Sequence, residues 1–325
     1  MSTPLSDAKQ AKPLLSLVVP FFNEGAAVDG FFQRIDPVLD ALTDFTFEIV
    51  CVNDGSSDDT LDQLLKRIPR DARLRVIDLS RNFGKEAALT AGLNQARGAA
   101  VIPIDADLQD PPELIPRLIE QWQNGYEMVL AKRANRDSDS YLKRQTARLF
   151  YRLHNAVSDI VLPENVGDFR LIDRQVLDAL NLLPENRRFM KGLFAWVGFK
   201  STTVEYTRDA RSAGSSKFSG WRLWNLALEG ITSFSTVPLR CWTYGGFAIS
   251  LLAFVYGLVT IIKTLIRGID MPGYASLLTV VLFLGGIQLI GIGVLGEYIG
   301  RVYLESKGRP IYLIRRQYHQ TPDQP

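Results

Sequence analysis

The chain is 325 residues long, which allows one large domain or two smaller ones. Its 37 Lys and Arg residues nearly balance 35 Asp and Glu residues, and the net charge of +2 argues against a nucleic acid as a main partner. The two cysteines, Cys51 and Cys241, exclude a disulfide framework and suit a reducing compartment.

Apolar runs alternate with helical patterns after a polar stretch over residues 1–13, which we expect to be loose. This alternation predicts a mostly parallel α/β sheet with helices on both faces. Ligands of such sheets bind beyond the carboxyl ends of the strands. The predicted strands are 14–22, 47–53, 74–79, 99–104 and 126–131, and the predicted helices are 26–42, 58–68, 85–97 and 112–123.

Acidic residues follow three of these strands: Glu24 after the first, Asp54 after the second, and Asp105 with Asp107 after the fourth. Mg²⁺ is usually held by one or two carboxylates together with phosphate oxygens and water. The pair Asp105 and Asp107 therefore predicts a metal-bridged diphosphate, although an isolated Asp-x-Asp can also be a capped turn. Asp54 is suited to accept hydrogen bonds from a base or a ribose.

Basic residues follow other strands. The segment Arg81–Lys85 opens a helix, where the helix amino terminus and the cations both favour phosphate. Arg133 follows the fifth strand. Arg211 and Lys217 lie in a Gly- and Ser-containing segment that suits a lid over phosphates. A purely electrostatic attraction to a membrane is the alternative for the last two.

Two amphipathic segments precede the most apolar part of the chain. Residues 137–160 place apolar side chains on one helical face, with Arg144, Arg148 and Arg152 on the rest. A basic amphipathic helix is typical of an anionic membrane surface, and an ordinary surface helix is the alternative. Residues 219–238 repeat this pattern with tryptophans, which favour the membrane interface, and are predicted to form a juxtamembrane amphipathic helix.

Two long stretches near the carboxyl terminus contain no charged residue, Trp242–Ile262 and Tyr274–Gly296. Each is about as long as a membrane-spanning helix requires, so the sequence predicts transmembrane helices over 239–267 and 274–300. A basic tail over 301–325 follows. Because positive flanks stay in the cytoplasm, both termini and the α/β domain should be cytoplasmic. Glycines in the second span allow close helix approach and are compatible with a homo-oligomer.

Several motifs together resemble one family of membrane enzymes. The chain resembles the family 2 inverting glycosyltransferases of GT-A fold, and within them the polyprenyl-phosphate sugar transferases related to dolichyl-phosphate mannose synthase. The segment Asn186–Gly198 is especially similar to the bactoprenol glucosyltransferase branch. The motifs that carry the resemblance are Val19–Glu24, Val52–Asp58, Arg81–Leu89, Asp105–Glu113, Gly167–Leu171, Arg211–Ser219 and Leu295–Pro310.

The resemblance implies a GT-A (Rossmann-like) catalytic domain over residues 14–218 that binds a UDP-sugar with Mg²⁺ or Mn²⁺. Asp168 matches the residue suggested as catalytic base, and Asp107 is expected to act with it. The uridine pocket would contain Pro20, Glu24, Val52 and Asp54. The metal would be held by Asp105, Asp107 and Gln109. The phosphates and the sugar would contact Asp105, Ala106, Arg133, Arg211 and Lys217.

The resemblance also implies a polyprenyl phosphate as acceptor, reached from a bacterial inner membrane. Because the second pKa of a phosphate monoester is about 6, this acceptor is already a nucleophile at neutral pH. Asp168 is then either a base or a group that orients Arg170 or the acceptor. The candidates for binding the lipid phosphate are Lys85, Arg144, Arg148, Arg152 and Arg170.

The sequence favours transfer of glucose from UDP-glucose to undecaprenyl phosphate, with inversion at the anomeric carbon. The same reaction with mannose, an N-acetylhexosamine or an aminoarabinose derivative is the first alternative. A non-catalytic membrane partner of a lipid-sugar flippase is the second.

Overall fold

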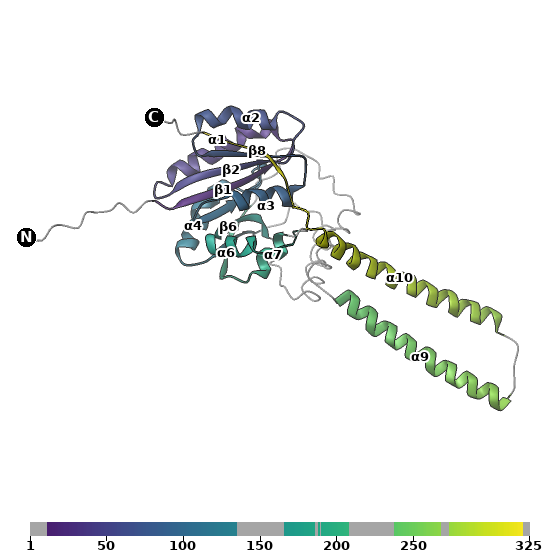
Figure 1. Cartoon of the computed structure of the whole chain (residues 1–325). Coiled ribbons are helices and arrows are strands. Elements are labelled where there is room, and N and C mark those ends of the chain that lie inside the picture. Colours follow the sequence, from purple (N-terminus) through teal and green to yellow (C-terminus); the bar gives the residue numbers. More distant parts are fainter. Residues whose placement is uncertain are drawn as a thin grey trace, which may run out of the picture. The chain divides into compact units, whose positions relative to one another are not determined.

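The computed structural model describes residues 12–134, 166–185, 188, 190–207, 237–267 and 273–320. These residues form two compact units (Figure 1). One is an α/β unit that contains the described residues up to Thr207 and those from Pro310 onward. The other contains the two long helices α9 (Val237–Arg267) and α10 (Tyr274–Ser306).

The α/β unit is built on an eight-stranded sheet with the strand order β7-β5-β6-β4-β1-β2-β3-β8. Strand β1 pairs in parallel with β2 and β4, β2 with β3, and β5 with β7. The other pairings, β4 with β6, β5 with β6 and β3 with β8, are antiparallel. The strands are β1 (Leu14–Phe21), β2 (Thr46–Asn53), β3 (Leu74–Leu79), β4 (Ala100–Pro103), β5 (Met128–Arg133), β6 (Val166–Asp173), β7 (Ser201–Tyr206) and β8 (Ile314–His319).

Helices cover both faces of this sheet, because the central strands are apolar on both sides. One face of β1, including Leu17 and Val19, belongs to a core with the apolar residues of α1, α2 and α4. On the other face α3 approaches so closely that a Cβ on Gly92 would lie 2.3 Å from Val18 Cγ1. The helices of this unit are α1 (Val28–Ala41), α2 (Thr60–Arg67), α3 (Lys85–Gln95), α4 (Ile115–Gln123), α6 (Arg174–Asn181) and α7 (Met190–Trp196).

The five strands and four helices predicted up to residue 131 are confirmed, with boundaries that differ by a few residues. The sheet is more mixed than predicted, because β6 and β8 run antiparallel to their neighbours. The basic tail over 301–325 also differs from the prediction. Helix α10 continues to Ser306, and the chain then returns to the sheet as β8, which covers the edge of β3.

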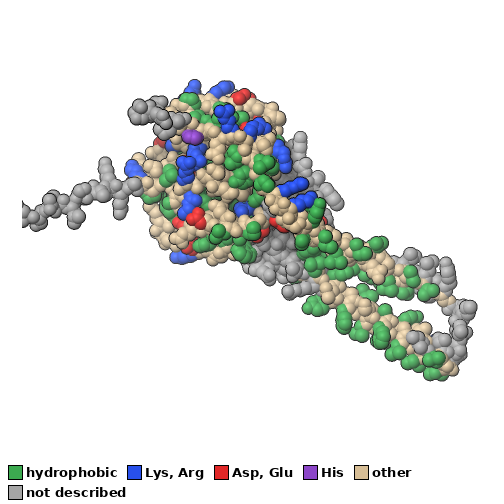
Figure 2. All heavy atoms as spheres, viewed as in Figure 1, with side chains coloured by type: hydrophobic (Ala, Val, Ile, Leu, Met, Phe, Trp, Pro, Cys, Tyr) green, Lys and Arg blue, Asp and Glu red, His purple; other side chains and the backbone are tan. Residues whose placement is uncertain are grey.

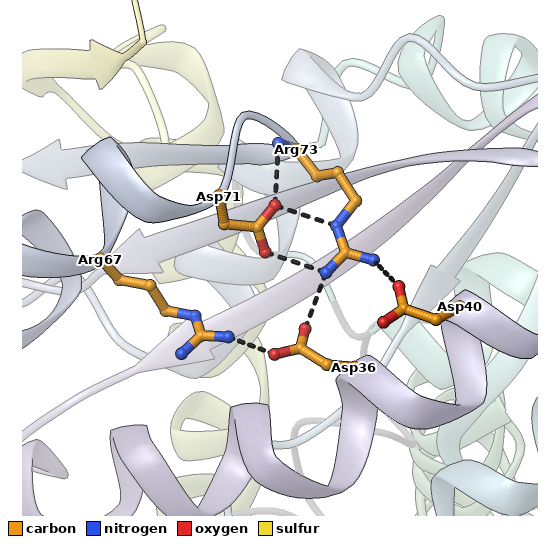
Figure 3. A network of polar contacts seen from close by, with 5 residues as sticks. All are labelled: Asp36, Asp40, Arg67, Asp71 and Arg73. Atoms are coloured by element: carbon orange, nitrogen blue, oxygen red, sulfur yellow. Dashed lines mark hydrogen bonds and ion pairs between the residues drawn. The ribbon is translucent and has the colours of Figure 1, made fainter.

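A network of ion pairs connects α1, α2 and the start of β3 at the amino-terminal edge of the sheet (Figure 3). The Arg73 guanidinium lies 2.9 Å from Asp36, 2.8 Å from Asp40 and 2.9 Å from Asp71. Arg67 also pairs with Asp36. The side chains of Arg73 and Asp36 are only 27% and 23% exposed, so water cannot fully replace these contacts.

Substituting Arg73→Ala should lower the free energy of unfolding by about 1–2 kcal/mol, because two partly buried carboxylates lose a partner. Thermal unfolding of the full chain in detergent measures this as a lower Tm. Arg70→Ala is the matched control, since Arg70 lies nearby on the surface. Equal Tm values for the two variants would show that the network does not stabilise the fold.

Helices α9 and α10 are each long and apolar enough to cross a membrane, over Cys241–Thr260 and Phe283–Ser306. Hydrophobic side chains cover much of their visible surface (Figure 2). These are not core helices, because 0% and 6% of the two windows are buried. The two helices touch where the Trp242 indole lies against Gly291, so close that a Cβ there would lie 2.2 Å from the ring. This confirms that a glycine of the second span allows close approach.

Candidate active site

Acidic side chains from four strands meet at the carboxyl-terminal edge of the parallel strands. Glu24 follows β1, Asp54 follows β2 and Asp105 follows β4. Asp168 lies near the start of β6, and because β6 is antiparallel to β4 its start lies at the same edge. The register of β4 and β6 pairs Ala100 with Asp173. The same register, extended beyond the end of β4, would bring Asp105 opposite Asp168.

A crevice at this edge brings together most of the residues predicted for the donor site. Asn82, Gly84 and Ala88 complete its wall from the turn before α3 and from α3 itself. Asn82 is not among the predicted site residues, although it lies within Arg81–Lys85, the segment predicted to favour phosphate. The predicted residues that line the crevice are Pro20, Glu24, Asp54, Lys85, Asp105, Ala106 and Asp107.

Lys85, the first residue of α3, connects two carboxylates of the site. Its Nζ lies 2.7 Å from Asp105 Oδ1 and 2.8 Å from Asp168 Oδ2. Burial alone would lower the pKa of the Lys85 ammonium, but Asp168 and Asp105 raise it above its ordinary value. Burial would raise the pKa of Asp168, yet Lys85, Lys191 and Arg170 hold it below the ordinary range. Asp168 is therefore a stable carboxylate at neutral pH.

Negative charge is in excess on the other side of the crevice. Burial raises the pKa of Glu24 to about 7, with further contributions from Asp107 and Asp105. Burial also raises the pKa of Asp105, and repulsion from Asp168 and Asp107 adds to this effect. The amide Nε2 of Gln109 donates to Asp107 Oδ2 at 2.6 Å. Gln109 therefore orients the Asp107 carboxylate.

These residues fit a divalent cation that is shared with a ligand. Within the described residues no group of three or more His, Cys, Asp or Glu side chains could hold a metal ion by itself. Asp105 and Asp107 supply two carboxylates to the crevice, and the excess negative charge favours a cation there. Two carboxylates with the remaining positions filled by phosphate oxygens and water is the usual environment of Mg²⁺.

Asp54 shapes the turn that leads into α3. Its two carboxylate oxygens accept the backbone N–H groups of Phe83 at 2.8 Å and Gly84 at 2.9 Å. Gly55, with φ +61°, is needed here because a Cβ would lie 2.3 Å from the Arg81 backbone. Asp54 thus fixes the position of Lys85 through the backbone, and its predicted contact with a base or ribose stays a prediction.

Two predicted residues, Val52 and Arg170, lie elsewhere than expected, and the predicted donor contact of Arg133 stays a prediction. Val52 is fully buried under Gly92 of α3, so its side chain does not line the predicted uridine pocket. Arg170 is 3% exposed and donates to the Gly167 carbonyl at 2.7 Å, which speaks against the predicted contact with a lipid phosphate. Its burial follows from packing of the guanidinium on the Phe194 ring. Arg133 donates to the Tyr206 hydroxyl at 3.3 Å, beside Asp110.

Glu86 belongs to the surroundings of the site and was not predicted. Burial and the negative charge of Asp168 raise its pKa to about 7. The one sequence signal for Glu86 as a site residue is its position directly after Lys85. The remaining predictions fall outside the described residues: Arg144, Arg148, Arg152, Arg211, Lys217, the helix over 137–160 and the juxtamembrane segment up to residue 236.

Comparison with known proteins extends over both units. Residues 16–180 match the profile of Glycosyl transferase family 2. The chain belongs to this family. Residues 237–302 match the GtrB C-terminal hairpin, which is the segment of α9 and α10. The chain is thus a glycosyltransferase with a GT-A-like α/β unit, and the hairpin with its two apolar helices indicates a membrane-associated protein.

Relatives resemble this family 2 glycosyltransferase along nearly its whole length. It is 54% identical to an SfII prophage-derived bactoprenol glucosyl transferase of Shigella flexneri, over 95% of this chain and 99% of the relative. It is 55% identical to a prophage bactoprenol glucosyl transferase homolog of Escherichia coli K12, over 93% and 98%. A solved mannosyltransferase of Pyrobaculum calidifontis, in complex with GDP-Man and Mn²⁺, has 16% identity and a TM-score of 0.47, over 92% and 88%.

Proposed function

We propose that this glycosyltransferase transfers glucose from UDP-glucose to undecaprenyl (bactoprenol) phosphate, with inversion at the anomeric carbon. The main support is sequence identity to proteins named bactoprenol glucosyl transferases. The identity is 54% over 95% of the chain, which includes both the α/β unit and the hairpin. The acceptor of such enzymes is a lipid phosphate, and a hairpin with two exposed apolar helices suits such an acceptor.

The donor binds in the crevice at the carboxyl edge. The rim formed by Pro20, Glu24 and the turn at Asp54 receives the nucleoside, and Asp105 and Asp107 lie toward the diphosphate. These two carboxylates would hold Mg²⁺ or Mn²⁺, which would supply positive charge to offset the charge of the departing UDP. Gln109 keeps Asp107 oriented for this role through its 2.6 Å hydrogen bond. Arg211 and Lys217, which lie outside the described residues, would contact the phosphates.

The acceptor phosphate attacks from the side of Asp168. A phosphate monoester is already ionised at neutral pH, so no strong base is needed. Asp168 would also be a poor base, because the nearby cations hold its pKa below the ordinary range. We therefore assign Asp168 the role of orienting Lys85 and the acceptor. Arg144, Arg148 and Arg152 are the candidates to bind the phosphate group of the lipid where it leaves the membrane surface.

The protein is proposed to lie in the bacterial plasma membrane with the α/β unit and both termini in the cytoplasm. The support is the distribution of basic residues. Lys307, Arg309, Arg315 and Arg316 follow the second apolar helix, and positive flanks are retained on the cytoplasmic side.

A donor panel tests the proposal. Purified full-length protein in detergent, with Mg²⁺ and undecaprenyl phosphate, should transfer radiolabel to the lipid fraction from UDP-[¹⁴C]glucose. It should do so far less from GDP-mannose or UDP-N-acetylglucosamine, since a hydrogen-bonding sugar pocket discriminates between such donors. Omission of the lipid phosphate is the control and should abolish label transfer. Label on lipid from only one of the other donors would refute glucose, and no transfer from any donor would refute the reaction.

A further inference from the structure

The Lys85 ammonium occupies a position between the donor side and the acceptor side of the site. It lies within 2.9 Å of both Asp105 oxygens and 2.8 Å of Asp168 Oδ2. Asp105 comes from the end of β4 and Asp168 from β6, so a single cation joins the two strands. Lys85 thus supplies positive charge to the carboxylates when no other cation is bound.

A divalent cation bound by Asp105 and Asp107 would conflict with this arrangement. The oxygens of Asp105 that now accept from Lys85 Nζ are the atoms that a metal requires as ligands. A divalent ion and an ammonium sharing one carboxylate would also repel each other by several kcal/mol at an effective dielectric constant of about 20. A divalent ion that takes these oxygens as ligands would therefore displace the ammonium from Asp105.

Lys85 is able to move, whereas its second partner is held in place. The Lys85 side chain is 49% exposed and extends from the first turn of α3, so it can turn away from Asp105 without repacking the core. The Asp168 side chain is 19% exposed and lies in a strand of the sheet. Its Oδ1 is buried and has no hydrogen-bond partner in the part of the chain that the structure describes, so it can accept a further donor.

We propose that Lys85 is a built-in counter-cation that competes with the divalent metal for Asp105 and, once displaced, stays at Asp168 to bind the phosphate of the acceptor. This inference rests on the proposed function for the metal and the acceptor. It makes Lys85 a positioning residue that links donor binding to acceptor binding. The metal-bound donor removes Lys85 from Asp105, and the ammonium then becomes free for an incoming anion.

Mn²⁺ binding without nucleotide or lipid tests the competition directly. The free Mn²⁺ signal in electron paramagnetic resonance reports the Kd for full-length protein in detergent. Lys85→Gln should bind Mn²⁺ about ten-fold more tightly than the wild type, because a competing cation is removed from beside two carboxylates. Lys85→Arg keeps the charge and should stay close to the wild type. Lys132→Gln is the matched control, since Lys132 pairs with Glu205 on the surface.

The direction in which the Kd for Mn²⁺ changes distinguishes loss of a competing cation from damage to the site. A disturbed site would weaken Mn²⁺ binding, whereas the proposal requires Lys85→Gln to strengthen it while sugar transfer to lipid falls. Unchanged or weaker binding in Lys85→Gln, or no detectable binding in either protein, would overturn the proposal. Wild-type transfer from UDP-glucose would leave the proposed function standing in that case. Loss of transfer from every donor in the wild type would instead refute the proposed function.

Discussion

Asp107→Asn should lower kcat/KM for UDP-glucose by about 10²–10³-fold, with little effect on Tm. The carboxylate charge that offsets the diphosphate is lost, and an electrostatic group of this kind contributes about that factor to catalysis. Asp107 is exposed in the crevice and accepts hydrogen bonds from the backbone and side chain of neighbouring Gln109, so its replacement by Asn leaves the core packing intact. Asp107 tests the metal more cleanly than Asp105, because Asp105 also pairs with Lys85.

Steady-state transfer to undecaprenyl phosphate, repeated over a range of Mg²⁺ concentrations, measures this effect. The variant should require more metal for half-maximal rate than the wild type. Asp62→Asn is the matched control, because Asp62 is an exposed carboxylate on α2 that does not line the crevice. A variant with wild-type kcat/KM and an unchanged metal requirement would show that Asp107 does not act on the donor.

Ending the chain at Arg309 should prevent the α/β unit from folding stably, although every crevice residue remains. This change removes β8, whose residues from Ile314 to His319 pair with Leu79 to Arg75 of β3. Strand β3 would then become an exposed edge with unpaired backbone groups, which favours aggregation. Asp78, which is 1% exposed, would also lose Arg315 at 3.5 Å and keep the Asn53 amide at 2.8 Å.

The truncated protein should be recovered mainly as aggregate, with no transfer of sugar to lipid. Arg315→Leu removes the ion pair to Asp78 together with a 2.6 Å hydrogen bond to the Ser80 carbonyl. It should lower the stability by about 1 kcal/mol, because the arginine is itself exposed. Arg316→Leu, in the same strand, should cost less, since it removes a contact with the face of the Tyr318 ring rather than an ion pair to a buried carboxylate. A truncated protein with wild-type Tm and transfer would contradict the role given to β8.

Local sequence patterns were sufficient to predict most strands and helices of the α/β unit and both helices of the hairpin. The apolar runs of β1 and β2 become strands because their side chains are buried on both faces of a sheet. The length and apolar composition of the two charge-free stretches were enough to predict the long helices α9 and α10. The rule that places ligands at the carboxyl ends of strands also brought Glu24, Asp105 and Asp107 into one crevice.

The failures of prediction concern side chains whose surroundings come from distant segments. The resemblance implies Val52 as a pocket residue, and Val52 does share its face of β2 with Asp54, two positions on, but α3 covers that face and Gly92 packs on Val52. Arg170 looked like a free cation, and only the packing of α7 over β6 shows that Phe194 covers it. Strand β8 was missed because its charged sequence, Ile-Arg-Arg-Gln-Tyr-His, is typical of an edge strand rather than of a core strand.

The sequence by itself determined the family, the α/β and hairpin organisation and the acidic residues that line the crevice, because each of these is marked by a local pattern of neighbouring residues. Only the tertiary structure decided that Lys85 joins Asp105 to Asp168. Lys85 and Asp168 are 83 positions apart, and their 2.8 Å contact depends on the antiparallel entry of β6 beside β4. Strand pairing across such separations is governed by the packing of the whole sheet, which no local pattern contains.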